Sequence, residues 1–269
     1  MGVLREHGVS RGRGFGVVRR RPNRADRRAE FEHVGPNFAW APATAHHFLA
    51  GRSLVKRHGE RTALARVDFG IRSAEVVAVV GPSGAGKTTL LQVMAGAVRP
   101  DEGAVVLDGH RVDRLGATRR AELRRCEFGF VLPGGLLLSE FTTAENAALP
   151  LMLRGAGREQ ALASSCEWLH RLRLGGWERR LPGELSREQL VRVAIARALI
   201  HRPKAVFADE PTNGMDECAG SETWDALLRS AASTKAAVVV ATQDRNLAAR
   251  ADRVVEIRDG KLVGGAMTG

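Results

Sequence analysis

A glycine-rich segment, GPSGAGKTTL, carries the side chains of this chain that are best suited to bind a nucleotide. It follows the G-x-x-x-x-G-K-[ST] spacing from Gly81 to Thr88. Gly84 and Gly86 permit positive φ angles, so backbone N–H groups can turn toward an anion. Lys87 would reach the β- and γ-phosphates, and Thr88 would offer a hydroxyl to Mg²⁺. The nucleotide-binding residues expected from this loop are Gly81, Pro82, Ser83, Gly84, Ala85, Gly86, Lys87, Thr88 and Thr89.

Two adjacent carboxylates, Asp209 and Glu210, end the apolar run KAVFADE. Asp209 would emerge at the carboxyl end of a strand, where ligands bind in parallel sheets, and it could hold Mg²⁺ through water. Glu210 could polarise an attacking water as a general base. The alternative, a solvated acidic pair, fits poorly directly after a buried strand.

Short β-branched runs must position these residues. We expect strands at 76–80, 104–109, 127–132, 204–210, 236–242 and 253–257. One helix should start in the glycine loop and run to about Ala97. A second should start at Ser186, whose hydroxyl forms a capping box with Gln189, and end before Pro203. Strands that alternate with helices predict an α/β fold with a mainly parallel sheet.

The order of these motifs resembles the ATP-binding subunit of ABC transporters, over roughly residues 49–263. The run LPGELSREQLVRVAIARALIHRPKAVFADEPT is similar to that family's signature helix and acidic strand. FTTAENAALPLMLRG more narrowly resembles the subgroup that serves lipoprotein release, macrolide export and a related cell-division complex. The resemblance implies a P-loop NTPase fold with an antiparallel β part and a helical lobe at about 135–200. It also implies ATP with Mg²⁺ held between two cassettes, as a homodimer or a heterodimer, which serve a separate membrane permease.

Three motifs depart from the family's pattern. Arg187 and Glu188 replace two small residues of the signature. Ser186, which precedes them, can still donate to the partner's ATP. Pro133 stands where a glutamine contacts Mg²⁺. Gln243 replaces the histidine that contacts the γ-phosphate, and it can hydrogen-bond but cannot carry a proton charge.

Two further positions are matched by the family's pattern. His58 lies where an aromatic residue usually stacks on adenine, although a solvated loop histidine explains it almost as well. Asp216 matches an aspartate that communicates across the dimer.

The departures predict slow hydrolysis, because each lost donor or positioning group costs on the order of 100-fold in rate. We expect Glu210, Lys87 and Gln243 to carry the catalysis that remains. The alternative is a regulatory or structural module that binds ATP and rarely hydrolyses it. The transported substrate and its direction belong to a permease and cannot be derived from this chain.

Composition limits the remaining possibilities. The chain has 269 residues and a net charge of +11, and its first 50 residues hold nine arginines against four acids. We expect residues 1–48 to be a disordered extension and residues 49–269 to form the ATP-binding domain. The extension could touch anionic lipid or nucleic acid, but a DNA-associated function is disfavoured because no long coiled-coil insertion is present. The three cysteines are expected to be free thiols. We expect the protein to be cytoplasmic and to be bound to the inner face of the membrane through the permease.

Overall fold

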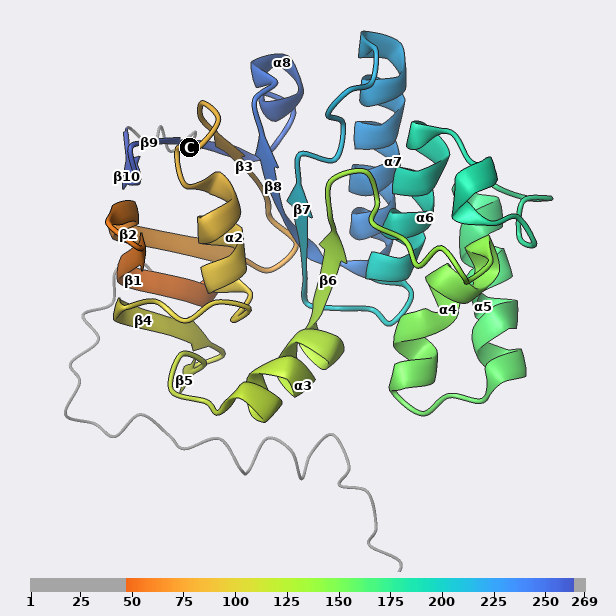
Figure 1. The fold of residues 1–269 in the computed structure, drawn as a ribbon, viewed down its shortest axis with the longest axis horizontal. Coiled ribbons are helices and arrows are strands. Elements are labelled where there is room, and N and C mark those ends of the chain that lie inside the picture. Colours follow the sequence, from red (N-terminus) through yellow and green to blue (C-terminus); the bar gives the residue numbers. More distant parts are fainter. Residues whose placement is uncertain (1–46, 264–269) are drawn as a thin grey trace, which may run out of the picture. The chain divides into compact units, whose positions relative to one another are not determined.

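Buried, β-branched strands form the central sheet of the part of the chain that the computed structural model describes, residues 47–263. The strand order is β10-β9-β3-β8-β7-β6, and every pairing is parallel except β9 with β10 (Figure 1). These strands are β3 (Val76–Val80), β6 (Phe128–Val131), β7 (Ala205–Asp209), β8 (Ala237–Thr242), β9 (Arg253–Arg258) and β10 (Lys261–Leu262). β7 and β8 are buried along their whole length, as expected for strands covered on both faces. The predicted α/β class with a mainly parallel core is confirmed.

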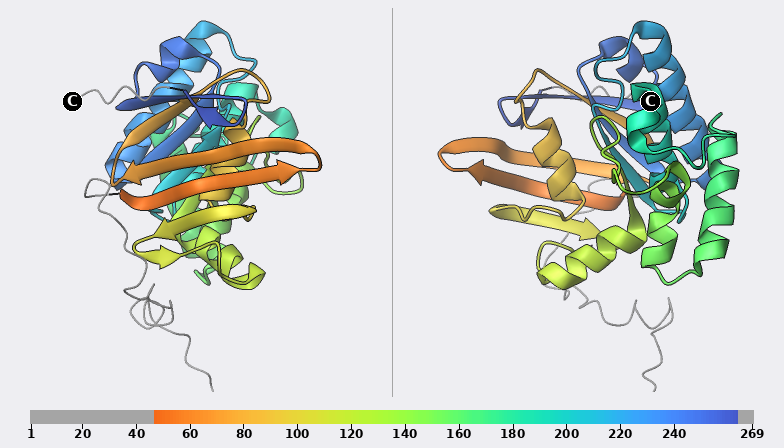
Figure 2. Two further views of the ribbon diagram at one scale, coloured as in Figure 1. Left: turned by 90° about the vertical axis from the view of Figure 1, so that its left-hand side faces the viewer. Right: turned by 45° about the vertical axis from the view of Figure 1, so that its right-hand side comes forward.

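A second, antiparallel sheet of four strands lies beside α2, in the order β2-β1-β4-β5 (Figure 2). Its strands are β1 (His47–His58), β2 (Arg61–Arg72), β4 (Glu102–Leu107) and β5 (His110–Arg111). The sequence analysis missed the long β1–β2 hairpin, because several register shifts interrupt the alternation of buried and exposed residues along it. β1 begins at His47, two residues before the expected domain boundary. The remainder of the arginine-rich extension lies outside the described residues.

The helices are α2 (Lys87–Met94), α3 (Ala117–Glu127), α4 (Thr143–Leu153), α5 (Arg158–Arg171), the 3₁₀ turn η1 (Pro182–Glu184), α6 (Arg187–Leu199), α7 (Glu217–Thr234) and α8 (Arg245–Ala248). The prediction that the first helix reaches Ala97 is wrong, because α2 ends at Met94. Gly96 has a φ of +66°, and the N–H of Ala97 donates to the carbonyl of Gln92 at 2.8 Å, which closes the helix in a Schellman motif. Within the described residues, no helix is long and apolar enough to cross a lipid bilayer.

The helical lobe contains α4, α5 and the start of α6 (Figure 1). Asn146 of α4 is fully buried and holds the preceding loop through its side chain, which accepts from the N–H of Leu138 at 2.8 Å and donates to the carbonyl of Phe141 at 2.9 Å. The predicted capping box at the start of α6 is confirmed: Ser186 Oγ accepts from the N–H of Gln189 at 3.2 Å.

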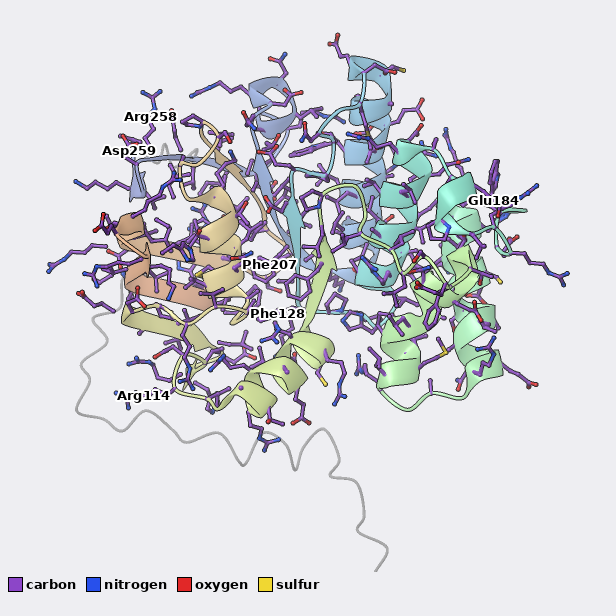
Figure 3. All side chains as sticks on the ribbon, viewed as in Figure 1. Arg114, Phe128, Glu184, Phe207, Arg258 and Asp259 are labelled. Atoms are coloured by element: carbon purple, nitrogen blue, oxygen red, sulfur yellow. The ribbon has the colours of Figure 1, made fainter. Side chains whose placement is uncertain are left out.

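The second half of α6 leaves the lobe and packs on the central sheet. Gly129 of β6 lies against the carbonyl of Ala198, where any Cβ atom would overlap it. Phe128 and Phe207 meet edge to face beside this contact, with ring centroids 5.3 Å apart (Figure 3). α6 therefore connects the lobe rigidly to the strand that ends at Asp209. Cys126, Cys166 and Cys218 are free thiols, as expected.

Candidate functional site

The glycine loop joins β3 to α2, and its backbone has the conformation that glycine permits. Gly84 and Gly86 have φ angles of +75° and +111°, and a Cβ atom on Gly86 would overlap the carbonyl oxygen of Ala63. Lys87 begins α2 and is 5% exposed. Its Nζ donates to the carbonyls of Gly81 at 2.8 Å and Pro82 at 3.1 Å. The loop thus wraps around its own lysine, which leaves the start of α2 and its positive dipole end facing a concave surface.

Thr88 and Asp209 meet where α2 and β7 approach each other. The hydroxyl of Thr88 donates to Oδ2 of Asp209 at 2.8 Å. Burial raises the pKa of the Asp209 carboxyl, the negative charge of Glu210 adds to this, and the hydrogen bond from Thr88 and the charge of Lys87 oppose it. Oδ1 of Asp209 is buried without a hydrogen-bond partner. A hydroxyl beside a buried carboxylate with an unused oxygen is a donor set that fits Mg²⁺, which prefers oxygen ligands and few protein contacts.

Glu210 brings a second carboxylate to the lysine. Its Oε1 lies 3.2 Å from Nζ of Lys87, and its Oε2 accepts from the backbone N–H of Gln243 at 3.3 Å. The residue has a φ of +45°, and its N–H donates to the carbonyl of Ala241 at 2.9 Å. A left-handed backbone in a residue other than glycine is unfavourable and occurs most often where a site needs it. This conformation directs the carboxylate toward the glycine loop.

A cavity of about 380 Å³ opens over these residues. Its lining residues are His58, Arg61, Ala63, Ser83, Gly84, Gly86, Lys87, Thr88, Thr89, Glu210, Asn213 and Gln243. The fold therefore brings together most of the residues singled out in the sequence. Gly81, Pro82 and Ala85 belong to the same loop, and Asp209 lies beneath it. A cavity of about 450 Å³ beside α5 and α7 is larger, but the glycine loop does not reach it.

Three lining residues, Arg61, Ala63 and Asn213, were not anticipated. Arg61 faces His58 across the tip of the β1–β2 hairpin, and its Nη2 donates to the carbonyl of Gly84. His58 therefore ends a strand at the cavity, where it is exposed to solvent. The pairing of Arg61 with His58 could have been found from the two-residue turn at Gly59, a common hairpin signal. No sequence signal distinguishes Asn213.

The start of α6 lies outside this cavity lining. Ser186 uses its hydroxyl to cap the helix. Arg187 donates from Nη1 to the carbonyl of Asn213 at 3.0 Å, and Glu188 forms an ion pair with Arg192 of the same helix. Pro133 is exposed in the turn after β6 and does not line the cavity.

The residues around Asp216 and Gln243 have fixed backbones. Asp216 accepts from the N–H of Ala219 at 2.8 Å and caps α7. Asp244 caps α8 by accepting from the N–H groups of Asn246 at 2.9 Å and Leu247 at 3.0 Å. The turn at Gln243 is therefore held by its neighbour, whatever side chain Gln243 itself carries.

Comparisons with known proteins agree with this geometry. Residues 64–213 match the family described as ABC transporter. The chain is 40% identical over 203 residues to the lipoprotein-releasing system ATP-binding protein LolD of Shewanella denitrificans, which covers 76% of this chain and 87% of that protein. It is 41% identical over 219 residues to the macrolide export ATP-binding/permease protein MacB 1/2 of Paracoccus denitrificans, which covers 81% of this chain but 33% of that protein. Both names fall in the subgroup that the sequence resembles.

Among solved structures, the dimeric post-hydrolysis state of the ATP-binding cassette MJ0796, bound to ADP and Pi, superposes with a TM-score of 0.76. The two sequences are 32% identical, and the match covers 82% of this chain and 99% of the other. A second structure of dimeric MJ0796 matches with a TM-score of 0.75 and 31% identity.

Proposed function

This chain belongs to the ABC transporter family as an ATP-binding subunit, and from that premise we propose that it binds Mg²⁺–ATP over the glycine loop and hydrolyses it slowly. The observation that carries the proposal is the convergence of Lys87, Thr88 and Glu210 on one cavity. That cavity contains a phosphate-binding loop, a candidate metal site and a candidate base within a few ångströms of each other.

The loop and its lysine would bind the phosphates. Backbone N–H groups at residues 83–89 and the positive end of α2 favour a polyanion there. Lys87 now donates to two loop carbonyls and to Glu210. When a triphosphate enters, we expect the lysine to exchange part of these contacts for phosphate oxygens, which keeps its charge compensated. His58 and Arg61, at the hairpin tip, would lie along the nucleotide farther from the lysine.

The chain's own residues also define how Mg²⁺ would be held. Thr88 and Asp209 would be its protein ligands, the second directly or through water, with Oδ1 of Asp209 supplying the unused lone pairs. Bound there, the ion would neutralise the charge on the phosphates. Asp209 stays in position because β7 is buried on both faces and Thr88 fixes one of its oxygens.

Glu210 would act as the general base that polarises the attacking water. Its left-handed backbone and the N–H of Gln243 hold the carboxylate at the cavity. We attribute slow turnover to the remaining groups. Gln243 offers a hydrogen bond but no ionisable proton, and Pro133 adds no polar side chain. The loss of two such groups reduces a typical turnover of about 10 per second by several orders of magnitude.

The names of the relatives suggest the kind of complex in which this chain acts. LolD is an ATP-binding protein of a lipoprotein-releasing system, and MacB combines ATP-binding and permease parts. We propose that this chain pairs with a second cassette, identical or different, and couples ATP to a separate membrane permease on the cytoplasmic face. Binding without hydrolysis, as a regulatory module, is the second candidate, and it is favoured by the missing polar side chain at Pro133 and by the missing ionisable proton at Gln243.

Nucleotide turnover separates the two candidates. Phosphate release from ATP is measured for the purified chain with and without its permease, together with Glu210→Gln and Lys87→Ala. A transporter subunit predicts measurable turnover that Glu210→Gln abolishes while ATP binding persists. If Glu210→Gln changes neither turnover nor the lifetime of the ATP-bound dimer, hydrolysis plays no part and the regulatory candidate stands. If ATP does not bind to the unaltered chain, both candidates are wrong.

A further inference from the structure

Side chains of the first turn of α6 contact other segments of the same chain. Arg187 reaches across to the segment that follows β7, where its Nη1 donates to the backbone carbonyl of Asn213 at 3.0 Å. Its guanidinium lies over Gly214, which has a φ of +74° and where a Cβ atom would overlap Arg187 Nη1. A side chain at position 214 would therefore displace the guanidinium from this place.

Glu188 makes a second connection from the same turn. Its carboxylate pairs with Arg192 one turn farther along α6, and Arg192 also donates to Glu222 of α7 at 2.9 Å. Arg192 is 8% exposed, whereas the side chains of Glu188 and Glu222 are 30% and 49% exposed, so only the arginine end of this link is shielded from solvent. The negative charge of Glu188 is compensated within the chain, and it does not stand as an isolated charge at the end of the helix.

The segment that Arg187 contacts, residues 210–216, leads from Glu210 to the cap of α7. The N–H of Asn213 donates to the carbonyl of Glu210 at 3.2 Å, and both residues line the cavity. Asp216 fixes the far end by capping α7. The carbonyl of Asn213 lies between these two anchors, and Arg187 holds it from outside. A displacement of this segment would move Asn213 and Glu210 relative to Lys87.

We propose that Arg187 is a positioning residue for the ATP site of its own chain, acting through the 210–216 segment. The inference rests on the ATP site proposed above. Arg187 stands where the family's signature has a small residue, and this inference gives it a role within its own subunit. The link from Glu188 through Arg192 to Glu222 keeps the first turn of α6 in register with α7, so that Arg187 reaches Asn213. The competing role, a phosphate contact to the ATP of a second cassette, requires Arg187 to leave Asn213.

The two roles predict different results in a single subunit. ATP binding in the presence of Mg²⁺ is measured by calorimetry on the full chain, at a concentration at which sedimentation shows monomers. A second cassette is then absent, so an effect of Arg187 on ATP binding must act within the chain. We expect Arg187→Ala to raise the Kd about 3- to 10-fold, the effect of losing one solvent-accessible hydrogen bond from a charged donor. Arg187→Lys should recover most of the loss, because a lysine can still donate to the carbonyl.

Two comparisons distinguish positioning from a general loss of folded protein. Arg179→Ala removes an exposed arginine of the same lobe and should leave the Kd unchanged. Gly214→Ala should weaken ATP binding more in the unaltered chain than in Arg187→Ala, because part of its effect is the overlap with the guanidinium. A fall in binding stoichiometry at constant Kd would mean partial unfolding, and Arg187→Gln then replaces Arg187→Ala in the comparison.

A Kd for Arg187→Ala within twofold of that of the unaltered chain would overturn the inference. A changed rate of ATP hydrolysis by the Arg187→Ala dimer at an unchanged monomer Kd would instead assign Arg187 to the interface between cassettes. If the unaltered chain fails to bind ATP at all, the proposed function is wrong, and that result is distinct from either of these.

Discussion

Replacing Gln243 by histidine should accelerate ATP hydrolysis by about 10- to 100-fold. This is at or below the lower end of the contribution of one acid–base group, about 100-fold, because the glutamine can already donate a hydrogen bond. Gln243 lies in the cavity lining, and its backbone N–H donates to Oε2 of Glu210 at 3.3 Å. The backbone of this turn is held by Asp244, which caps α8, and by the hydrogen bond from the N–H of Asp244 to Thr242 at 3.0 Å. The substitution therefore changes a side chain that lines the cavity without moving the turn.

The expected gain corresponds to about 1.4 to 2.7 kcal/mol of the activation free energy. That is close to the free energy of one hydrogen bond to a charged group, about 1.5 to 3 kcal/mol. Gln243 is exposed, so the free energy of unfolding should change by no more than about 0.5 kcal/mol. The assay is phosphate release at saturating ATP and Mg²⁺, with Gln243→Ala as the matched control. Equal turnover, within twofold, for the glutamine, histidine and alanine forms would refute the reasoning, because residue 243 would then not act on the γ-phosphate.

Three further substitutions test the loop and its metal site. Lys87→Ala should weaken ATP binding by about 100-fold or more in calorimetry, because it removes the positive charge that lies at the glycine loop and would contact the phosphates. Asp209→Asn should raise the Tm of the nucleotide-free protein at pH 7, because burial raises the pKa of this carboxyl and disfavours its charged form. That advantage should vanish as the pH falls through the pKa of folded Asp209, and Mg²⁺–ATP should raise the Tm of the unaltered protein more than that of the variant. Gly86→Ala should lower the free energy of unfolding in urea by about 2 kcal/mol or more, because of its φ and the overlap with Ala63, whereas Gly109→Ala, with open space around it, should cost about 1 kcal/mol.

Five strands of the central sheet could be predicted from sequence because they are short and largely apolar, whereas the two-residue strand β10 was missed. An unbroken apolar run such as VVAVV at 76–80 indicates a buried strand even when the neighbouring strands are not known. The β1–β2 hairpin lacks this signal, since its strands carry Arg52, Lys56 and Arg66 between buried positions and contain register shifts. The end of α2 was placed three residues too far because AGAV continues the apolar pattern, and only the backbone shows that Gly96 reverses the chain.

The residues of the candidate site also divide into those that could be predicted from the sequence and those that could not. The glycine loop and the acids after β7 were recognisable because their spacing is fixed by local backbone geometry. Arg61 and Asn213 contact segments more than twenty residues away in the chain. The turn at Gly59 indicates that Arg61 pairs with His58, but no local pattern indicates that Arg61 or Asn213 reaches the cavity. The sequence analysis placed the charge of Glu188 near a polyphosphate, and it could not foresee the ion pair with Arg192 that compensates this charge.

Titration of the folded protein with ATP in the presence of Mg²⁺ tests the central claim most directly. The geometry predicts saturable uptake of one nucleotide per chain, lost in Lys87→Ala and weakened when Mg²⁺ is removed. An absence of heat and of any Tm shift at millimolar ATP would contradict the assignment of the glycine loop, Thr88 and Asp209 to a nucleotide site.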